Sequence, residues 1–131
     1  MILYVIDASA AAEYLLRTPV GVRVAEKIQD GWLLAPELLD VEVLSVLRRA
    51  IFRREVAEQR ALVAIEDLLE WPIDRIPHKS LAWAAWQHRN NVSAYDAFYV
   101  AAARLYDAPL LTTAGPLTRA PALGIAIENV R

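Results

Sequence analysis

The sequence predicts a parallel α/β sheet whose functional edge begins at Asp7. Five apolar residues, Ile2 to Ile6, run without a polar break and end at this carboxylate, which is typical of a central strand buried on both faces. Strong helix formers follow from residue 10 to 16, with Ser9 as a candidate N-cap. Strand-like and helix-like segments then alternate along the chain. Ligands of such sheets bind at the carboxyl ends of the strands, where Asp7 is expected.

The second helix and the second strand follow a break at Thr18-Pro19. Residues 20–30 carry apolar side chains near helical spacing, and Gly31 is the expected stop of this helix. Residues 32–35 are apolar and form a short predicted strand, which Pro36 ends. Proline is also well placed to open a helix, so the next helix is expected to start directly afterwards.

The middle of the chain is predicted to contain three helices and one short strand. The first two helices span about 37–53 and 56–71, with apolar residues that repeat at helical spacing. Residues 72–77 form a third strand, and its two prolines assign it to the edge of the sheet. A helix from residue 80 to about residue 90 follows.

The last third of the chain is predicted to alternate in the same way. Ser93 caps a helix over 94–106, residues 109–113 form the fourth strand, and one helical turn follows near residue 115. Residues 125–127 form a last edge strand. This alternation indicates a parallel sheet with right-handed crossovers, in which the fourth strand neighbours the first.

Composition narrows the protein class. A chain of 131 residues without a linker or repeat is expected to form one domain over 1–131. No apolar stretch is long enough to span a membrane, and the N-terminus lacks the basic region of a signal peptide, so a cytoplasmic protein is expected. The chain contains no cysteine, which excludes disulfides and thiolate chemistry. The hydrophobic fraction of 56% suggests an apolar face reserved for a partner.

Two further acids can reach the sheet edge. Glu42 points in nearly the same direction as Leu38 and Leu39 on its helix, whereas Asp40 faces away. A carboxylate in an apolar stripe is costly unless it is paired or binds a cation; the structural alternatives are a surface-exposed Glu42 or pairing with Arg49. Asp96 lies in the first turn of a helix that is apolar on every side from Ala97 to Ala103 and is therefore expected to be buried, although Ser93-x-x-Asp96 also fits a capping box.

Three converging carboxylates indicate a metal-dependent hydrolase. Asp7, Glu42 and Asp96 would repel one another unless a cation joined them. Oxygen-only ligands favour Mg²⁺ or Mn²⁺ over zinc. Such a metal can activate water and stabilise the charge on a phosphodiester under attack, which is the chemistry of a hydrolytic nuclease. His78 and His88 have no metal-ligand spacing, and neither is expected to act as the base.

These motifs together resemble the PIN domain, and within it the VapC-type toxins of bacterial toxin–antitoxin pairs. The resemblance runs nearly end to end and rests on Asp7 after its strand, on Pro36-x-Leu-Leu-x-Val-Glu42-Val, on Tyr95-Asp-Ala-Phe-Tyr-Val-Ala101, and on Leu110-Leu-Thr-Thr-Ala-Gly-Pro-Leu117. It implies a three-layer α/β/α sandwich and an endoribonuclease that needs Mg²⁺ or Mn²⁺. It also implies an RNA substrate and a cognate antitoxin that occludes the site. Asp7, Glu42 and Asp96 match the family's first three acidic positions.

The sequence departs from the family at two positions. Ala114 stands where a fourth acid usually follows the Leu-Thr-x strand, and Ser45 stands where an asparagine is frequent. A lost carboxylate predicts weaker metal binding and slower catalysis. The alternative function is a catalytically impaired module that binds RNA or a protein. Nearby hydroxyls that could hold a water or a phosphate oxygen belong to Ser9, Thr112 and Thr113.

Basic and apolar residues outside the acids suggest partner surfaces. Five arginines lie close together at the end of one helix and the start of the next: Arg48, Arg49, Arg53, Arg54 and Arg60. They could bind RNA phosphates, bind an acidic partner, or form a solvated helix end. Trp83 and Trp86 are expected in the core or an interface rather than stacked on bases. A homodimer is predicted because helix 37–53 is apolar around most of its circumference.

Overall fold

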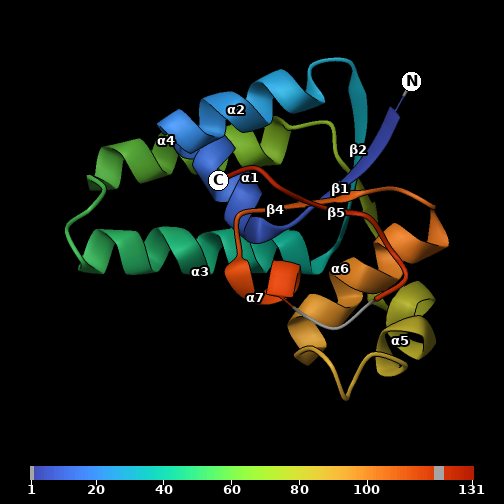
Figure 1. Ribbon diagram of the computed structural model, residues 1–131. Helices are drawn as coiled ribbons and strands as arrows, with labels where there is room; N and C mark the ends of the chain where they lie inside the picture. Colours follow the sequence, from blue (N-terminus) through green and yellow to red (C-terminus); the bar gives the residue numbers. More distant parts are fainter. Residues whose placement is uncertain (1, 120–122) are drawn as a thin grey trace.

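The computed structural model describes residues 2–119 and 123–131, and a five-stranded parallel sheet forms its centre (Figure 1). The strand order is β3-β2-β1-β4-β5. All four neighbouring pairs are parallel. The strands are β1 (Ile2–Ile6), β2 (Gly31–Pro36), β3 (Asp74–Ile76), β4 (Leu110–Thr112) and β5 (Ile127–Asn129).

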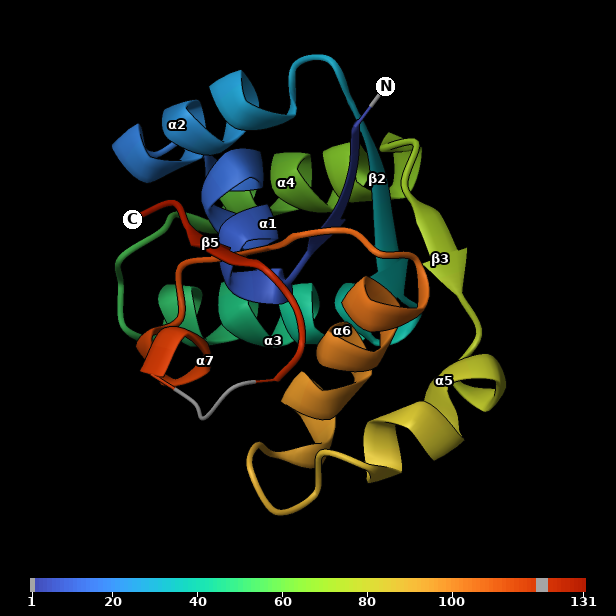
Figure 2. The same ribbon diagram turned by 45° about the vertical axis from the view of Figure 1, so that its right-hand side comes forward.

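Helices cover both faces of this sheet and complete a three-layer α/β/α fold (Figures 1 and 2). They are α1 (Ala8–Leu16), α2 (Pro19–Ile28), α3 (Leu38–Phe52), α4 (Glu58–Glu70), α5 (His78–Trp86), α6 (Ala94–Leu105) and α7 (Gly115–Arg119). Helix α1 packs against α2, α3 and α4, whereas α5 and α6 pack against each other. The predicted fold class is confirmed.

The order of the strands creates a crevice beside β1. The chain passes from β1 to β2 and β3 and then returns to add β4 on the other side of β1. The chain therefore builds the sheet in one direction from β1 and later in the other direction. Because all the crossovers are right-handed, the helices of the two halves lie on opposite faces of the sheet, and the chain diverges at the carboxyl ends of β1 and β4. Val5 pairs with Leu110, and Ile6 pairs with Leu111. The predicted contact between the first and fourth strands is confirmed.

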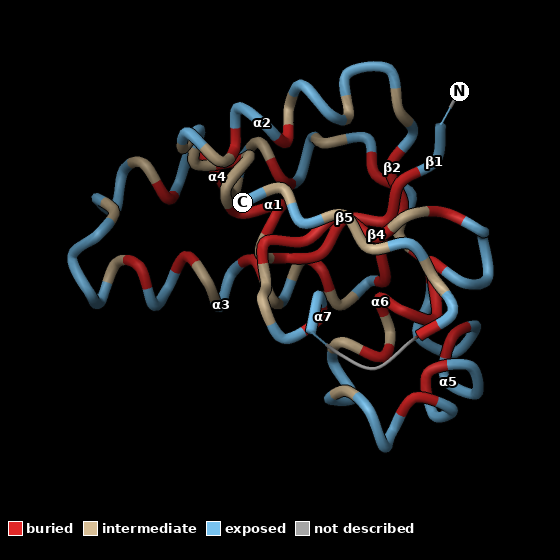
Figure 3. The backbone as a smooth tube through the Cα atoms, viewed as in Figure 1, coloured by how far each residue is buried: buried red, intermediate tan, exposed pale blue. Residues whose placement is uncertain are grey.

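The core lies where these central elements meet (Figure 3). Val5 and Ile6 of β1 and the whole of β4 are buried. Helix α6 is buried from Val100 to Ala103, as its apolar circumference predicts. The first turn of α6 does not open inside the molecule as its apolar character suggested: Ala94 and Tyr95 are exposed, and Asp96 is half-buried.

The start of α1 differs from the prediction that Ser9 caps it. Helix α1 begins at Ala8, and Asp7 is the N-cap, because its side chain accepts a hydrogen bond from the backbone N–H of Ala10. Aspartate is as effective an N-cap as serine. Gly31 also differs from expectation, since it is the first residue of β2 rather than the stop of α2.

Several boundaries shift by a few residues, as is usual at helix ends. Helix α4 begins at Glu58 instead of residue 56, and α5 spans His78–Trp86 instead of 80–90. Strand β5 lies at Ile127–Asn129 rather than 125–127. Trp83 is 82% exposed, which contradicts a core position for this side chain. No helix in the described part of the chain is long and apolar enough to cross a membrane.

Candidate functional site

Asp7 is the most deeply held acid of the site. Its side chain follows β1 directly and is only 5% exposed. One carboxylate oxygen, Oδ1, accepts hydrogen bonds from the hydroxyl of Ser9 at 2.6 Å and from the backbone N–H of Ala10 at 3.0 Å. The other, Oδ2, accepts one from the hydroxyl of Thr112 at 2.5 Å. Three donors from two elements therefore fix the carboxylate in one orientation.

The protonation of Asp7 reflects this environment. Burial raises the pKa of the carboxyl, and repulsion from Asp96 adds to the rise, while the hydrogen bonds from Ser9, Thr112 and Ala10 oppose it. The protein thus buries a carboxylate whose charge lacks a full partner. A bound cation would supply that partner.

The end of β4 is tied to the same acid. The hydroxyl of Ser9 accepts a hydrogen bond from the backbone N–H of Thr113 at 3.0 Å, and it lies 3.3 Å from the hydroxyl of Thr112. Thr112 in turn accepts one from the backbone N–H of Ala114 at 2.9 Å. Of the three predicted hydroxyls, Ser9 lines the open site, Thr112 supports Asp7, and Thr113 contributes its backbone N–H.

Glu42 and Asp96 approach from two different helices. Glu42 lies in the second turn of α3, and Asp96 lies in the first turn of α6, where Ser93 caps the helix by accepting from the Asp96 N–H at 3.1 Å. Burial raises the pKa of both carboxyls. Repulsion from Asp96 and Asp7 raises the pKa of Glu42 further, while the Tyr99 hydroxyl and Arg49 lower it.

The three acids share one cleft of about 480 Å³. Its walls come from the β1–α1 junction, from α3, from the start of α6 and from the segment after β4. The lining residues are Asp7, Ala8, Ser9, Leu38, Val41, Glu42, Ser45, Val46, Arg49, Tyr95, Asp96, Tyr99 and Ala114. The predicted convergence of Asp7, Glu42 and Asp96 on one cleft is present, and position 114 faces the same space.

The donor set of this cleft fits a hard divalent cation. Its acidic side chains are carboxylates with oxygen donors, and no histidine or cysteine is among the residues that line it. Within residues 2–119 and 123–131, no three acids or histidines already stand close enough to hold a metal ion. The three carboxylates therefore line one cleft but do not yet form a complete coordination shell. Binding of a cation would require these side chains to move closer together.

Tyr99 is a cleft residue that the sequence reasoning did not single out. Its side chain is 1% exposed, and its buried hydroxyl has no hydrogen-bond partner among the described residues. Burial, followed by the neighbouring Glu42 carboxylate, raises the pKa of this phenol, which therefore stays protonated. A signal was present: Tyr99 follows Asp96 by three residues, a spacing that places both on one helix face.

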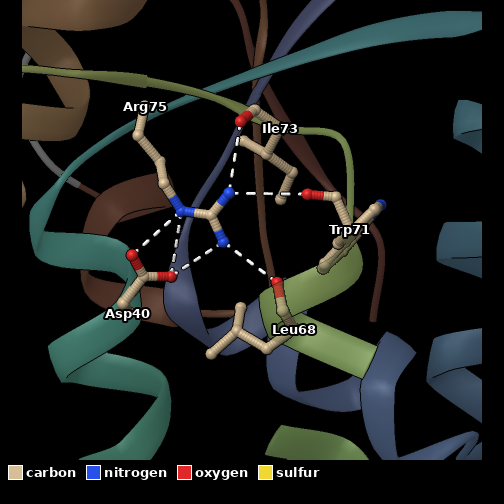
Figure 4. Close-up of polar contacts among 5 residues, drawn as sticks. All are labelled: Asp40, Leu68, Trp71, Ile73 and Arg75. Carbon is tan, nitrogen blue, oxygen red and sulfur yellow. Dashed lines mark hydrogen bonds and ion pairs between the residues drawn. The ribbon is translucent and has the colours of Figure 1, made fainter. Parts of the chain in front are cut away.

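Asp40 lies outside the cleft, in agreement with its predicted direction on α3. Arg75 binds both of its carboxylate oxygens, with Nε at 2.9 Å from Oδ2 and Nη2 at 2.9 Å from Oδ1 (Figure 4). The same guanidinium donates to the backbone carbonyls of Leu68, Trp71 and Ile73. Asp40 therefore fixes α3 to the α4–β3 connection and is not a free carboxylate.

The arginines of the predicted basic cluster have separate environments. Arg60 donates to the carbonyl of Leu15 at 2.7 Å and so closes the end of α1. Arg48 lies over the ring of Phe52, 4.5 Å from its centroid. Arg49 lines the acidic cleft. Of these three, only Arg49 is placed to meet a ligand of the cleft.

Comparisons with known proteins agree on one family. The family model described as PIN domain matches residues 4–117. The chain is 41% identical to Ribonuclease VapC1 of Mycobacterium tuberculosis over 130 residues, covering 97% of each protein. It is 36% identical to Ribonuclease VapC12 of the same species over 126 residues, covering 96% of this chain and 98% of the relative. The crystal structure of VapBC2 from Rickettsia felis bound to a promoter DNA fragment matches with a TM-score of 0.62 at 12% identity, covering 98% of both chains.

Proposed function

Because this chain belongs to the PIN domain family and is similar to VapC ribonucleases, we propose that it is a toxin of a toxin–antitoxin pair. In this proposal it is an endoribonuclease that hydrolyses RNA phosphodiester bonds with Mg²⁺ or Mn²⁺ and is neutralised by a cognate antitoxin. The observation that carries the proposal is the cleft lined by Asp7, Glu42 and Asp96 at the carboxyl ends of the strands. RNA as the substrate implies action in the cytoplasm.

The three acids hold the cation in this mechanism. Asp7 offers a preorganised carboxylate, since its hydrogen bonds from Ser9, Ala10 and Thr112 already fix its orientation. Glu42 and Asp96, which line the same cleft from α3 and α6, would complete the ligand set. A bound Mg²⁺ or Mn²⁺ would supply water activation and would neutralise charge on the phosphodiester under attack.

Other residues of the cleft orient the RNA. Arg49 lies on the same wall as Glu42 and offers a cation for a backbone phosphate. Ser9 can donate its hydroxyl to a phosphate oxygen or a water when it releases Asp7. Thr112 contributes indirectly, because its hydroxyl orients Asp7. Thr113 contributes its backbone N–H, which donates to the Ser9 hydroxyl.

Ala114 weakens the activity of this chain in the proposal. The position lines the cleft, and alanine offers no oxygen to a cation or to a water bound by it. With three carboxylates in place of four, metal affinity and rate both fall. The same observation favours a second candidate function, in which the PIN fold binds RNA or a protein partner without cutting RNA.

Apolar surface supports two protein partners. Helix α3 buries Leu39, Val43 and Leu47 against the core and still exposes Val41 and Leu44. Such exposed side chains favour a homodimer and an antitoxin contact. Trp83 and Trp86 on α5 add exposed aromatic surface and are assigned to an interface rather than to the core.

The proposal is tested with purified protein and a mixed RNA pool. We expect weak cleavage that requires Mg²⁺ or Mn²⁺, stops in EDTA, and is lost in each of Asp7→Asn, Glu42→Gln and Asp96→Asn while the circular dichroism spectrum is retained. Asp30→Asn is the matched control, because this acid is exposed and is not among the residues that line the cleft. Full metal-dependent activity in any of the three cleft variants would show that the residue's proposed role is wrong.

A further inference from the structure

The Tyr99 hydroxyl is a donor without an acceptor. It lies on α6, one turn after Asp96, and its oxygen is buried without a hydrogen-bond partner among the described residues. Leaving a buried polar group unpaired costs on the order of 1–3 kcal/mol. A folded protein tolerates such a cost most readily at a functional site, where the partner arrives with a ligand or a rearrangement.

Glu42 is the candidate acceptor for this hydroxyl, because both residues line the same cleft. The two side chains come from α6 and α3 and line the same cavity. The hydroxyl lies near enough to lower the pKa of Glu42 as a donor, although the pair does not complete a hydrogen bond. Glu42 is also the less supported acid, since Asp7 accepts three hydrogen bonds and no donor to Glu42 is found in residues 2–119 and 123–131.

A phenol suits this task for an electrostatic reason. Carboxylates that bind a cation need donors to orient them, but a lysine or arginine so placed would repel the cation and compete for the carboxylate. A neutral hydroxyl orients the carboxylate without adding positive charge. Arg49, the cation that lines the cleft, lies on Glu42's own helix seven residues further on, and its charge lowers the pKa of Glu42.

We propose that Tyr99 is a positioning residue whose hydroxyl donates to the Glu42 carboxylate and holds it in the orientation that joins Asp7 and Asp96 around one divalent cation. This inference rests on the proposed metal-dependent function. It assigns to Tyr99 the role that Ser9 and Thr112 have for Asp7. The Glu42 side chain is half-buried and can turn toward the hydroxyl, whereas Tyr99 is fixed by the core.

The test is the affinity for Mn²⁺, measured by isothermal titration calorimetry on the whole protein without RNA. Loss of a hydrogen bond that orients a metal ligand typically costs about 10- to 100-fold in affinity, and we expect a loss of about 10-fold or more in Tyr99→Phe. The melting temperature without metal should be retained, because the hydroxyl has no partner there. Tyr95→Phe is the matched control, since Tyr95 lines the same cleft but is 61% exposed, and its Mn²⁺ affinity should not change.

A double variant tests whether Tyr99 acts through Glu42. In the Glu42→Gln background, Tyr99→Phe should cause little further loss of Mn²⁺ affinity, because the two substitutions disrupt one ligand. An equal loss in both backgrounds, or wild-type affinity in Tyr99→Phe, would overturn the inference and leave the proposed nuclease standing. If the wild-type protein bound no Mn²⁺, the proposed function itself would fail, and the inference with it.

Discussion

The hydroxyl of Thr112 donates a 2.5 Å hydrogen bond to Asp7 and so joins the ends of β4 and β1. These are the two strands at which the chain diverges to build the sheet in opposite directions. The contact spans 105 residues of sequence. It ties the orientation of the central acid to the pairing of β1 with β4.

Thr112→Val tests this coupling. Thr112 is fully buried, and the substitution removes one donor to Asp7 and one acceptor for the Ala114 N–H. Unpaired buried groups cost about 1–3 kcal/mol, and we expect a loss of this size in the free energy of unfolding measured with urea. Thr113→Val is the control, because Thr113 contributes its backbone N–H to the network. Equal losses in both variants would contradict the role given to the Thr112 hydroxyl.

A pH dependence follows from the buried acid. Burial raises the pKa of Asp7 above its ordinary value of 3.8, so the folded protein keeps this proton at a higher pH than the unfolded chain does. The stability that it contributes is complete below pH 3.8 and is lost as the pH rises through the raised pKa. The pKa values of Glu42 and Asp96 are raised as well, and they contribute in the same direction.

We therefore expect Asp7→Asn to gain stability relative to wild type as the pH rises, when both are measured in EDTA. The amide is neutral at every pH, so the difference in melting temperature should grow from pH 4 toward pH 7. Mn²⁺ should reduce this difference by stabilising the wild-type protein, because a ligand stabilises the state that binds it. A difference that shrinks with rising pH would contradict the direction given for the Asp7 pKa.

The order of the elements could be predicted from the sequence because it depends on local patterns. The apolar run 2–6 became a central strand, and the stretch 97–103, which is apolar on every side of its helix, became the buried part of α6. The convergence of the acids followed from topology, since strands that run parallel end at one edge. The capping of α1 was wrong by two residues, because Asp7 and Ser9 are both good N-caps and the sequence alone did not rank them.

Contacts between distant side chains could not be predicted. The pairing of Asp40 with Arg75 joins residues 35 positions apart, and its geometry depends on how α3 packs on the α4–β3 connection (Figure 4). The unpaired hydroxyl of Tyr99 depends in the same way on where Glu42 points from another helix. Helix periodicity gives the face of each residue, but the packing of two helices decides what meets that face.

The two adjacent arginines of α3 allow a matched test of RNA binding. Arg49 lines the cleft, whereas Arg48 lies over Phe52. We expect Arg49→Gln to weaken binding of a fluorescent RNA in EDTA. The slope of log affinity against log salt concentration should fall in magnitude by about one, as expected for the loss of one phosphate contact. Arg48→Gln removes the same charge and should have the smaller effect. Equal effects would indicate a diffuse basic surface instead of a contact at the cleft.

The homodimer is tested on the exposed face of α3. Leu44 is partly exposed and lines an apolar groove between α3 and α4, so a charge there should disrupt a contact between copies. We expect the wild-type protein to sediment as a dimer at micromolar concentration without antitoxin, and Leu44→Glu to sediment as a monomer. A wild-type monomer under these conditions would count heavily against the homodimer.

A substitution at Ala114 distinguishes the two proposed functions, the nuclease and the binding module. The residue lines the cleft and follows β4, next to the segment that holds Asp7. An aspartate at this position would add a fourth carboxylate to the same space, bind Mg²⁺ or Mn²⁺ more tightly and stabilise more charge during the reaction. Loss of one electrostatic contributor of this kind typically costs about 10²–10³ in rate, and Ala114→Asp should recover a gain of that order.

Two controls make this gain interpretable. Ala114→Asn introduces a side chain of the same size and with one oxygen, as Ala114→Asp does, but without the negative charge. It should therefore recover less activity than Ala114→Asp if electrostatics dominates. Ala114→Asp combined with Asp7→Asn should lose the gain, because Asp7 is the preorganised ligand of the cleft. If Ala114→Asp bound Mn²⁺ no more tightly than wild type and cut no RNA, a fourth carboxylate would not be what the cleft lacks. The binding module would then be the better account of this chain.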